Sequence, residues 1–251
     1  MSGKFVWYEV MTSDQKAGTE FYKRVVGWTA QDMPMPGMTY TLLKVGEAQV
    51  AGLMTMPQEA TGAPPFWLGY ISCDDVDAAA KKAVSLGGSI YRQPDDIPNV
   101  GRFAVVADPQ GAAFALFKAA RADDSAPTGD GPGYPGWREL YAVDGKTAFD
   151  FYGQMFGWEK GEGMDMGAMG VYQIFNYDGA QRGGMMTKPP QMPRAAWLYY
   201  FNVDAIDSAA QRVRDAGGVV MNGPMEVPGG AWIVQCADPQ GAMFALVAPK
   251  R

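Results

Sequence analysis

The stretch ADPQGAAFAL at residues 107–116 decides the fold, because it returns almost unchanged as ADPQGAMFAL at residues 237–246. The segment FYKRVVGW, which begins at Phe21, returns with the same spacing as FYGQMFGW, which begins at Phe151. A spacing of 130 positions is far longer than the roughly 20–50 residues of a solenoid repeat. The chain is therefore a tandem duplication of a whole domain.

The two copies are joined by a segment rich in Pro, Gly, Asp and Ser, ARADDSAPTGDGPGYPG, which begins at Ala120. This composition is typical of a linker without a hydrophobic core of its own. We therefore predict a first domain at 1–119, a linker at 120–134 and a second domain at 135–251.

Each copy divides again into two units of one strand, one helix and three strands. The pattern predicts a helix at residues 13–27, with Ser13 or Asp14 as its N-cap and Gly27 at its end. DPQG is the expected hairpin turn between the last two strands of each copy, with Gly at a position that needs a positive φ. Four βαβββ units give an α+β fold class. In the first unit we expect strands at 5–10, 28–33, 39–45 and 49–56.

Composition excludes several classes of function. The chain has 251 residues, a formal net charge of −6 and no histidine. A negative charge argues against nucleic acid and anionic membranes as partners, and the lack of histidine excludes Ser-His-Asp triads and Cys-His pairs. No signal peptide or membrane span is expected. Cys73 and Cys236 are interpreted as buried thiols, so we expect a cytoplasmic protein.

The paired units resemble the vicinal oxygen chelate superfamily, which holds glyoxalase I, bleomycin-resistance proteins, fosfomycin-resistance enzymes and extradiol dioxygenases. The resemblance is carried by the helix that ends in FY…GW, by WLGYISCDDVDAAA from Trp67 and by ADPQGAAFAL. It covers the whole chain outside the linker. It implies two glyoxalase/bleomycin-resistance-like domains, each a cup-shaped mixed sheet, with any metal on the floor of the cup.

The resemblance also implies where metal ligands would lie. The family has His or Gln on the first strand, usually His at the start of the second unit, and Glu after the DP-x-G turn. None of the residues at these positions can donate to a metal. We therefore expect no metal and no cofactor. The residues are Trp7, Leu68 and Ala115 in the first repeat and Trp137, Leu198 and Ala245 in the second.

Aromatic and acidic residues remain as candidates for ligand contacts. Residues two apart on a strand share a face, so the motif W-x-E places an indole beside a carboxylate in both copies. The alternative is that the tryptophan fills the core and that Glu9 pairs with Arg102, which Trp232 replaces in the second copy. On that ground the second cup is the better candidate for a ligand. The candidate ligand-binding residues are Trp7, Glu9, Tyr40, Tyr70, Trp137, Glu139, Tyr172 and Tyr200.

Methionines cluster at corresponding places in the two copies. Both DMPMPGM and GEGMDMGAM contain the pattern M-x-M-x-x-M. Because methionine adapts to irregular apolar shapes, we expect an irregular loop that acts as a lid over an apolar ligand. Packing between the repeats is the alternative. The residues are Met33, Met35 and Met38 in the first copy and Met164, Met166 and Met169 in the second.

Three classes of function remain. The first is a metal-free protein that binds a small, partly apolar or aromatic molecule in one or both cups. The second is a glyoxalase-like or lyase-like enzyme with Glu9 or Glu139 as general base, and the third is a structural or partner-binding module. We expect a monomer with internal pseudo-twofold symmetry, because a duplicated chain supplies both copies of a self-complementary surface.

Overall fold

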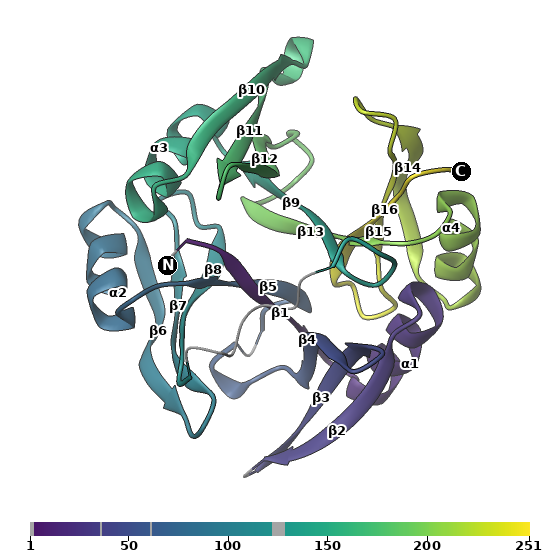
Figure 1. Ribbon diagram of the computed structural model, residues 1–251, viewed down its shortest axis with the longest axis horizontal. Helices are drawn as coiled ribbons and strands as arrows, with labels where there is room; N and C mark the ends of the chain where they lie inside the picture. The colour runs from purple at the N-terminus through teal and green to yellow at the C-terminus, as the bar shows by residue number, and fades with distance from the viewer. Residues whose placement is uncertain (1–2, 36, 61, 122–128) are drawn as a thin grey trace. The chain divides into compact units, whose positions relative to one another are not determined.

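The computed structural model describes residues 3–35, 37–60, 62–121 and 129–251. Within these residues the chain forms sixteen strands, four α-helices and two short 3-10 turns (Figure 1). Residues 122–128 of the expected linker lie outside the described part. Among the described helices, none is long and apolar enough to cross a membrane.

The first repeat forms one eight-stranded mixed sheet with the strand order β2-β3-β4-β1-β5-β8-β7-β6. β1 pairs with β4, and β5 with β8, in parallel, whereas the hairpin partners are antiparallel. Its strands are β1 (Phe5–Thr12), β2 (Thr29–Met35), β3 (Met38–Val45), β4 (Ala48–Thr55), β5 (Phe66–Ser72), β6 (Ser89–Ile97), β7 (Gly101–Ala107) and β8 (Ala113–Ala119).

The second repeat forms a matching sheet with the order β10-β11-β12-β9-β13-β16-β15-β14. The two sheets and four helices confirm the α+β class and the four βαβββ units. The strands are β9 (Pro135–Ala142), β10 (Glu159–Asp165), β11 (Val171–Tyr177), β12 (Ala180–Thr187), β13 (Ala196–Asn202), β14 (Val219–Glu226), β15 (Trp232–Ala237) and β16 (Met243–Ala248).

The first helix begins and ends where the sequence predicts. α1 has Asp14 as its N-cap, whose side chain accepts a hydrogen bond from the backbone N–H of Ala17, and it ends at Gly27 with φ of 91°. Glycine suits this left-handed position because it has no Cβ. The helices are α1 (Gln15–Val26), α2 (Val76–Ser85), α3 (Gly145–Phe156) and α4 (Ile206–Asp215), and the 3-10 turns are Gln58–Ala60 and Gly167–Met169.

The compact units of the chain do not coincide with its repeats. Two compact units form, and each combines the second half of one repeat with the first half of the other. α2 packs with α3 in unit 1 and α1 packs with α4 in unit 2 (Figure 1). Unit 1 contains Met1–Val6, Gly69–Ala126 and Arg138–Leu198, and unit 2 contains Trp7–Leu68, Pro127–Trp137 and Tyr199–Arg251.

The repeated DPQG turn has a clear role in this packing. Asp108 opens the turn of the first repeat, and its Oδ1 accepts from the backbone N–H groups of Gln110 and Ala112. Its Oδ2 accepts at 3.2 Å from the hydroxyl of Tyr152, which belongs to the second repeat. The Tyr152 hydroxyl in turn accepts from Trp197 Nε1 at 3.0 Å. The turn therefore ties the two repeats together inside unit 1.

Unit 2 contains the same arrangement with the repeats exchanged. Tyr22 donates to Asp238 Oδ2 at 2.9 Å and accepts from Trp67 Nε1 at 2.8 Å. Both aspartates and both tyrosines are buried. Trp28, which follows α1, is buried and donates to the backbone oxygen of Gly133 at 2.8 Å.

The methionine segments differ from the prediction of an irregular loop. Met33 and Met35 belong to β2, and Met38 begins β3, so that the segment is a regular hairpin in which Met35 lies opposite Met38. In the second repeat Met164 also lies within a strand, whereas Met166 and Met169 belong to the 3-10 turn region. In the first repeat β2 and β3 remain paired as far as Met35 and Met38, so these three methionines lie in strands rather than in the predicted loop.

Candidate functional site

The family's metal-ligand positions are filled by residues without donor atoms. Ala115 lies on β8 opposite Tyr70, and Ala245 lies on β16 opposite Tyr200. Both alanines are fully buried, so neither position can offer a carboxylate. Across the described residues, no group of three or more His, Cys, Asp and Glu side chains is placed to hold a metal ion. The donor set does not fit the metal that the family implies.

Three of the predicted site residues meet in unit 2. Trp7 Nε1 donates to the Tyr40 hydroxyl at 2.9 Å, and that hydroxyl donates to Glu9 Oε1 at 2.7 Å. Glu9 is only 5% exposed, and a buried carboxylate is costly unless it is hydrogen-bonded. The sheet face that carries this triad, here called the Glu9 face, therefore offers two aromatic surfaces beside a hydrogen-bonded acid.

Glycine makes the triad possible. Gly52 lies on β4 opposite Glu9, and a Cβ at this position would overlap the Tyr40 hydroxyl. Tyr40 can therefore cross β4 to reach the carboxylate only because residue 52 has no side chain. The second repeat has the same arrangement in unit 1, where Gly184 lies opposite Glu139 and a Cβ at Gly184 would overlap the ring of Tyr172.

The remaining predicted residues lie on the same types of strand. Glu139 and Tyr172 are 6% and 9% exposed and belong to unit 1, as does Tyr70. Trp137, on β9, is half-buried and belongs to unit 2, together with the buried Tyr200. The structure thus joins Trp7, Glu9 and Tyr40 by hydrogen bonds. For the other predicted residues it gives the strand, the unit and the burial.

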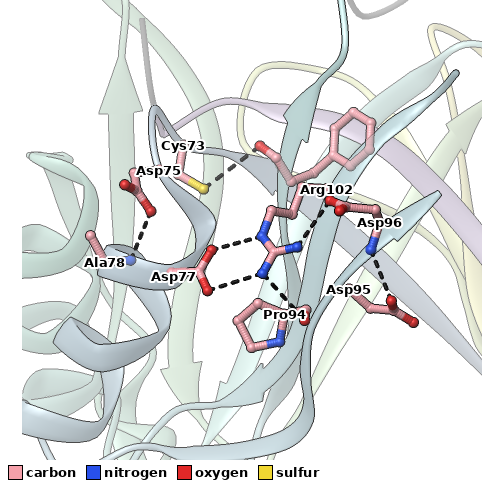
Figure 2. A network of polar contacts seen from close by, with 9 residues as sticks. Cys73, Asp75, Asp77, Ala78, Pro94, Asp95, Asp96 and Arg102 are labelled. Atoms are coloured by element: carbon pink, nitrogen blue, oxygen red, sulfur yellow. Dashed lines mark hydrogen bonds and ion pairs between the residues drawn. The ribbon is translucent and has the colours of Figure 1, made fainter. Parts of the chain in front are cut away.

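The partners of Arg102 differ from those of the alternative in which it pairs with Glu9. Arg102 makes a bidentate contact with Asp77 of α2 at 2.7 and 3.0 Å, and it contacts Asp96 at 2.9 Å (Figure 2). These hydrogen bonds hold the pKa of Asp77 below its ordinary value. Arg102 lies on β7, on the sheet face that α2 covers.

In the second repeat the corresponding acid pairs with an arginine from a different part of the chain. Trp232 stands at the position of Arg102, and the guanidinium of Arg251 lies 4.9 Å from the centre of its ring. Arg251 also pairs with Asp207 at 3.1 Å. The acid at the start of α4 therefore receives its guanidinium from the end of the chain, so the exchange of Arg for Trp says nothing about Glu139.

Methionines extend the Glu9 face toward the hairpin tip. Met33 lies directly opposite Tyr40, and Met38 is two residues before Tyr40 on the same strand. Directly paired residues and residues two apart share a face, so Met33, Met35 and Met38 all lie on the face of Tyr40. Met33 and Met38 are 41% and 37% exposed. The triad is thus bordered by accessible thioethers.

The face of unit 1 that carries Ala115, here called the Ala115 face, holds residues that were not among the candidates predicted from the sequence. Val105 and Phe103 lie opposite Ala115 and Phe117, and Arg92 lies opposite Val105. The Arg92 guanidinium lies 4.9 Å from the centre of the Phe103 ring. Period-two alternation from Ala115 through the neighbouring strands could have indicated these residues.

The face of unit 2 that carries Ala245, the Ala245 face, is polar instead. Gln235 lies opposite Ala245 and donates to the Tyr200 hydroxyl at 2.9 Å. Asn222, opposite Gln235, donates to the Gln235 Oε1 atom at 3.3 Å. A row of hydroxyl and amide groups thus crosses β13, β15 and β14 beside the alanine.

The cysteines do not offer a nucleophile. Both are buried and free. Burial raises the pKa of Cys73 to about 11 and that of Cys236 to about 12. Because the thiolate is the reactive form, both thiols are inert at neutral pH.

Comparisons with known proteins identify the family of the chain. The model of the Glyoxalase/Bleomycin resistance protein/Dioxygenase superfamily matches residues 4–116 and 136–246. "Putative glyoxylase CFP32" of Mycobacterium tuberculosis is 34% identical over 247 residues, covering 97% of this chain and 94% of the relative. The anthracycline biosynthesis protein DnrV of Streptomyces peucetius is 31% identical over 260 residues, covering 98% and 93%.

Solved structures show the same fold at low identity. A Mn(II)-bound glyoxalase from Novosphingobium aromaticivorans has a TM-score of 0.65 at 17% identity, covering 99% of this chain and 83% of its own. An extradiol ring-cleaving dioxygenase from B. fuscum has a TM-score of 0.69 at 16% identity, covering 98% and 72%. With its two repeats matched separately by one family model, the chain belongs to the glyoxalase/bleomycin resistance protein/dioxygenase superfamily.

Proposed function

We propose that this protein binds a small organic molecule that carries an aromatic ring and a hydrogen-bond donor, and that it does so without a metal. The Glu9 face is the proposed site. The observation that carries the proposal is the chain of hydrogen bonds from Trp7 through Tyr40 to Glu9, at 2.9 and 2.7 Å. It replaces metal coordination at the strand where the family has its first ligand.

The direction of these hydrogen bonds indicates the chemistry of the ligand. Tyr40 donates to Glu9, so the acid is present as an acceptor. A carboxylate offers about four lone-pair sites, and in this proposal one of them accepts from an N–H or O–H group of the ligand. An ammonium group is favoured over a neutral donor because hydrogen bonds between charged groups are stronger.

The apolar part of the ligand is expected to lie on the aromatic side chains. The indole and phenol rings of Trp7 and Tyr40 stack on planar molecules, and both attract a cation over their faces. Met33 and Met38 border this surface and adapt to ligands of different outline. In this proposal the methionines also act as a lid over the apolar part of the ligand.

The relatives are consistent with a planar ligand. DnrV is named for anthracycline biosynthesis, and anthracyclines contain fused aromatic rings. Its similarity extends over 98% of this chain, so that both repeats are included in the comparison.

The proposal is tested by titration of 1-naphthylmethylammonium into the protein, followed by tryptophan fluorescence. The Glu9→Gln variant should bind at least about tenfold more weakly, because a hydrogen bond to a charged group contributes roughly 1.5–3 kcal/mol. Glu47→Gln is the matched control, since it makes the same change at a fully exposed side chain. Equal affinity of Glu9→Gln and the control would refute the site, and so would a loss of thermal stability in Glu9→Gln with unchanged affinity.

The enzymatic alternative assigns Glu9 or Glu139 as a general base. It is favoured by the glyoxalase names among relatives and solved structures. In this case a bound substrate is consumed, and conversion stops in Glu9→Gln or Glu139→Gln while binding persists. A ligand that is recovered unchanged after prolonged incubation supports binding alone.

A further inference from the structure

The two repeats place different chemistry at equivalent positions of their second halves. Each pair lies 130 positions apart, and each member lies on the face of Ala115 or Ala245. The first repeat has one cationic, one aliphatic and two aromatic residues where the second has two amide and two aliphatic residues. The pairs are Arg92 and Asn222, Phe103 and Ile233, Val105 and Gln235, and Phe117 and Val247.

Arg92 is the only charged member of these pairs, and its position is well defined. Its guanidinium lies over the Phe103 ring at 4.9 Å and contacts Asp95 Oδ2 at 3.0 Å. The side chain of Arg92 is 40% exposed and that of Asp95 is 58% exposed. Because exposed ion pairs contribute at most about 1 kcal/mol, a ligand carboxylate can compete with Asp95 for the guanidinium.

Two half-buried apolar side chains lie near Arg92 on the same face. Val105 lies directly opposite Arg92, and Phe117 lies in the next strand on the same face. Both are half-buried, whereas Phe103 beneath the guanidinium is buried. The Ala115 face thus combines an accessible apolar surface with a planar cation, which is preorganised on an aromatic ring and suited to bidentate contact with a carboxylate.

We propose that the Ala115 face of unit 1 binds a planar aromatic acid, with its carboxylate on Arg92 and its ring against Val105 and Phe117. This site goes beyond the proposed function, because it uses other residues and selects the opposite charge. The Ala245 face lacks the cation, since Asn222 stands at the position of Arg92 and donates to Gln235. The duplicated chain has therefore diverged, and its repeats differ in the ligands that they select.

The test uses 1-naphthoate as the probe and isothermal titration calorimetry as the readout. Arg92→Gln should weaken naphthoate binding by about tenfold or more, because a charge-assisted contact is removed. Arg24→Gln is the control, since it removes the same charge from the exposed side of α1. Asp95→Asn should tighten binding, because it removes the internal competitor for the guanidinium.

The opposite signs of these two variants separate ligand binding from a structural ion pair. If the pair is purely structural, Arg92→Gln and Asp95→Asn should both lower thermal stability, and the affinity for naphthoate should be unchanged in both. That result, or the absence of naphthoate binding to the parent protein, would overturn the proposal. Should Arg92→Gln fail to fold, the Asp95→Asn variant still decides. Titration with 1-naphthylmethylammonium reports on the Glu9 face, so the two proposals fail independently.

Discussion

Replacement of Tyr152 by phenylalanine removes a single oxygen atom from the buried junction between the two repeats. That oxygen donates to Asp108 Oδ2 at 3.2 Å and accepts from Trp197 Nε1 at 3.0 Å. A hydrogen bond to a charged group contributes roughly 1.5–3 kcal/mol and a neutral one about 1 kcal/mol. We therefore expect Tyr152→Phe to lower the free energy of unfolding by about 3 kcal/mol.

The assay is thermal unfolding followed by calorimetry. For a chain of this size, 1 kcal/mol corresponds to roughly 2–4 °C in melting temperature, so the expected decrease is about 6–12 °C. Tyr91→Phe is the matched control, because it removes the hydroxyl of a side chain that is 61% exposed. A melting temperature of Tyr152→Phe equal to that of the control would refute the assignment of the DPQG turn as the tie between repeats.

The loss should also depend on pH. Burial is the main cause that raises the pKa of Asp108, and the hydrogen bond from Tyr152 opposes this shift. Without the hydroxyl the pKa in the folded state rises further above the unfolded value, so stability is lost as pH rises through the folded value. The difference between Tyr152→Phe and the parent protein should therefore be larger at pH 7 than near pH 4. A difference that grows on acidification would contradict this explanation.

Other consequences of the structure are equally accessible. Gly52→Ala should cost about 1–3 kcal/mol by forcing Tyr40 from its place, whereas Gly131→Ala, with no atom near its Cβ, should be neutral by the same melts. Because the pKa of Asp77 is lowered in the folded state, its contribution to stability is lost as the pH falls through that folded-state pKa. Arg102→Gln should therefore flatten the acid side of a plot of melting temperature against pH. An unchanged slope would count against the Asp77–Arg102 pair. Light scattering should give the mass of one chain, 27.1 kDa, and twice that mass would contradict the expectation of a monomer.

Local signals predicted most of the fold because the same signals occur twice. Asp14 and Gly27 mark the ends of α1, and the glycines of the DPQG turns, Gly111 and Gly241, have φ of 90° and 99°. Each of these features depends on a few neighbouring residues. The residues at the family's Glu position could also be identified from the sequence, because Ala115 and Ala245 occupy the same place in the duplicated motif.

Contacts between distant segments were harder to predict. From the sequence, Arg102 was one of two alternatives as the partner of Glu9, but a side chain's partner depends on which face of the sheet it occupies, and Arg102 contacts Asp77 of α2. The actual partner, Tyr40, reaches Glu9 only because Gly52 lacks a side chain. The alternation of residues along one strand does not show that a glycine on the neighbouring strand leaves room for such a contact.

The roles of the turn aspartates were also underestimated. Asp108 reads as an ordinary turn residue, and its turn hydrogen bonds are the expected ones. Its second oxygen meets Tyr152 only because halves of different repeats pack into one unit. This exchange of partners between repeats is a property of the tertiary packing, which hydrophobic periodicity does not specify.

The central claim is that ligand binding on the Glu9 face needs no metal, and calorimetry before and after metal removal tests it most directly. The protein is dialysed against a chelator, analysed for Zn, Mn, Fe and Ni, and titrated with 1-naphthylmethylammonium with and without added divalent metal. We predict no stoichiometric metal in the purified protein and the same affinity in both titrations. Binding that appears only when one equivalent of metal is restored would contradict the claim.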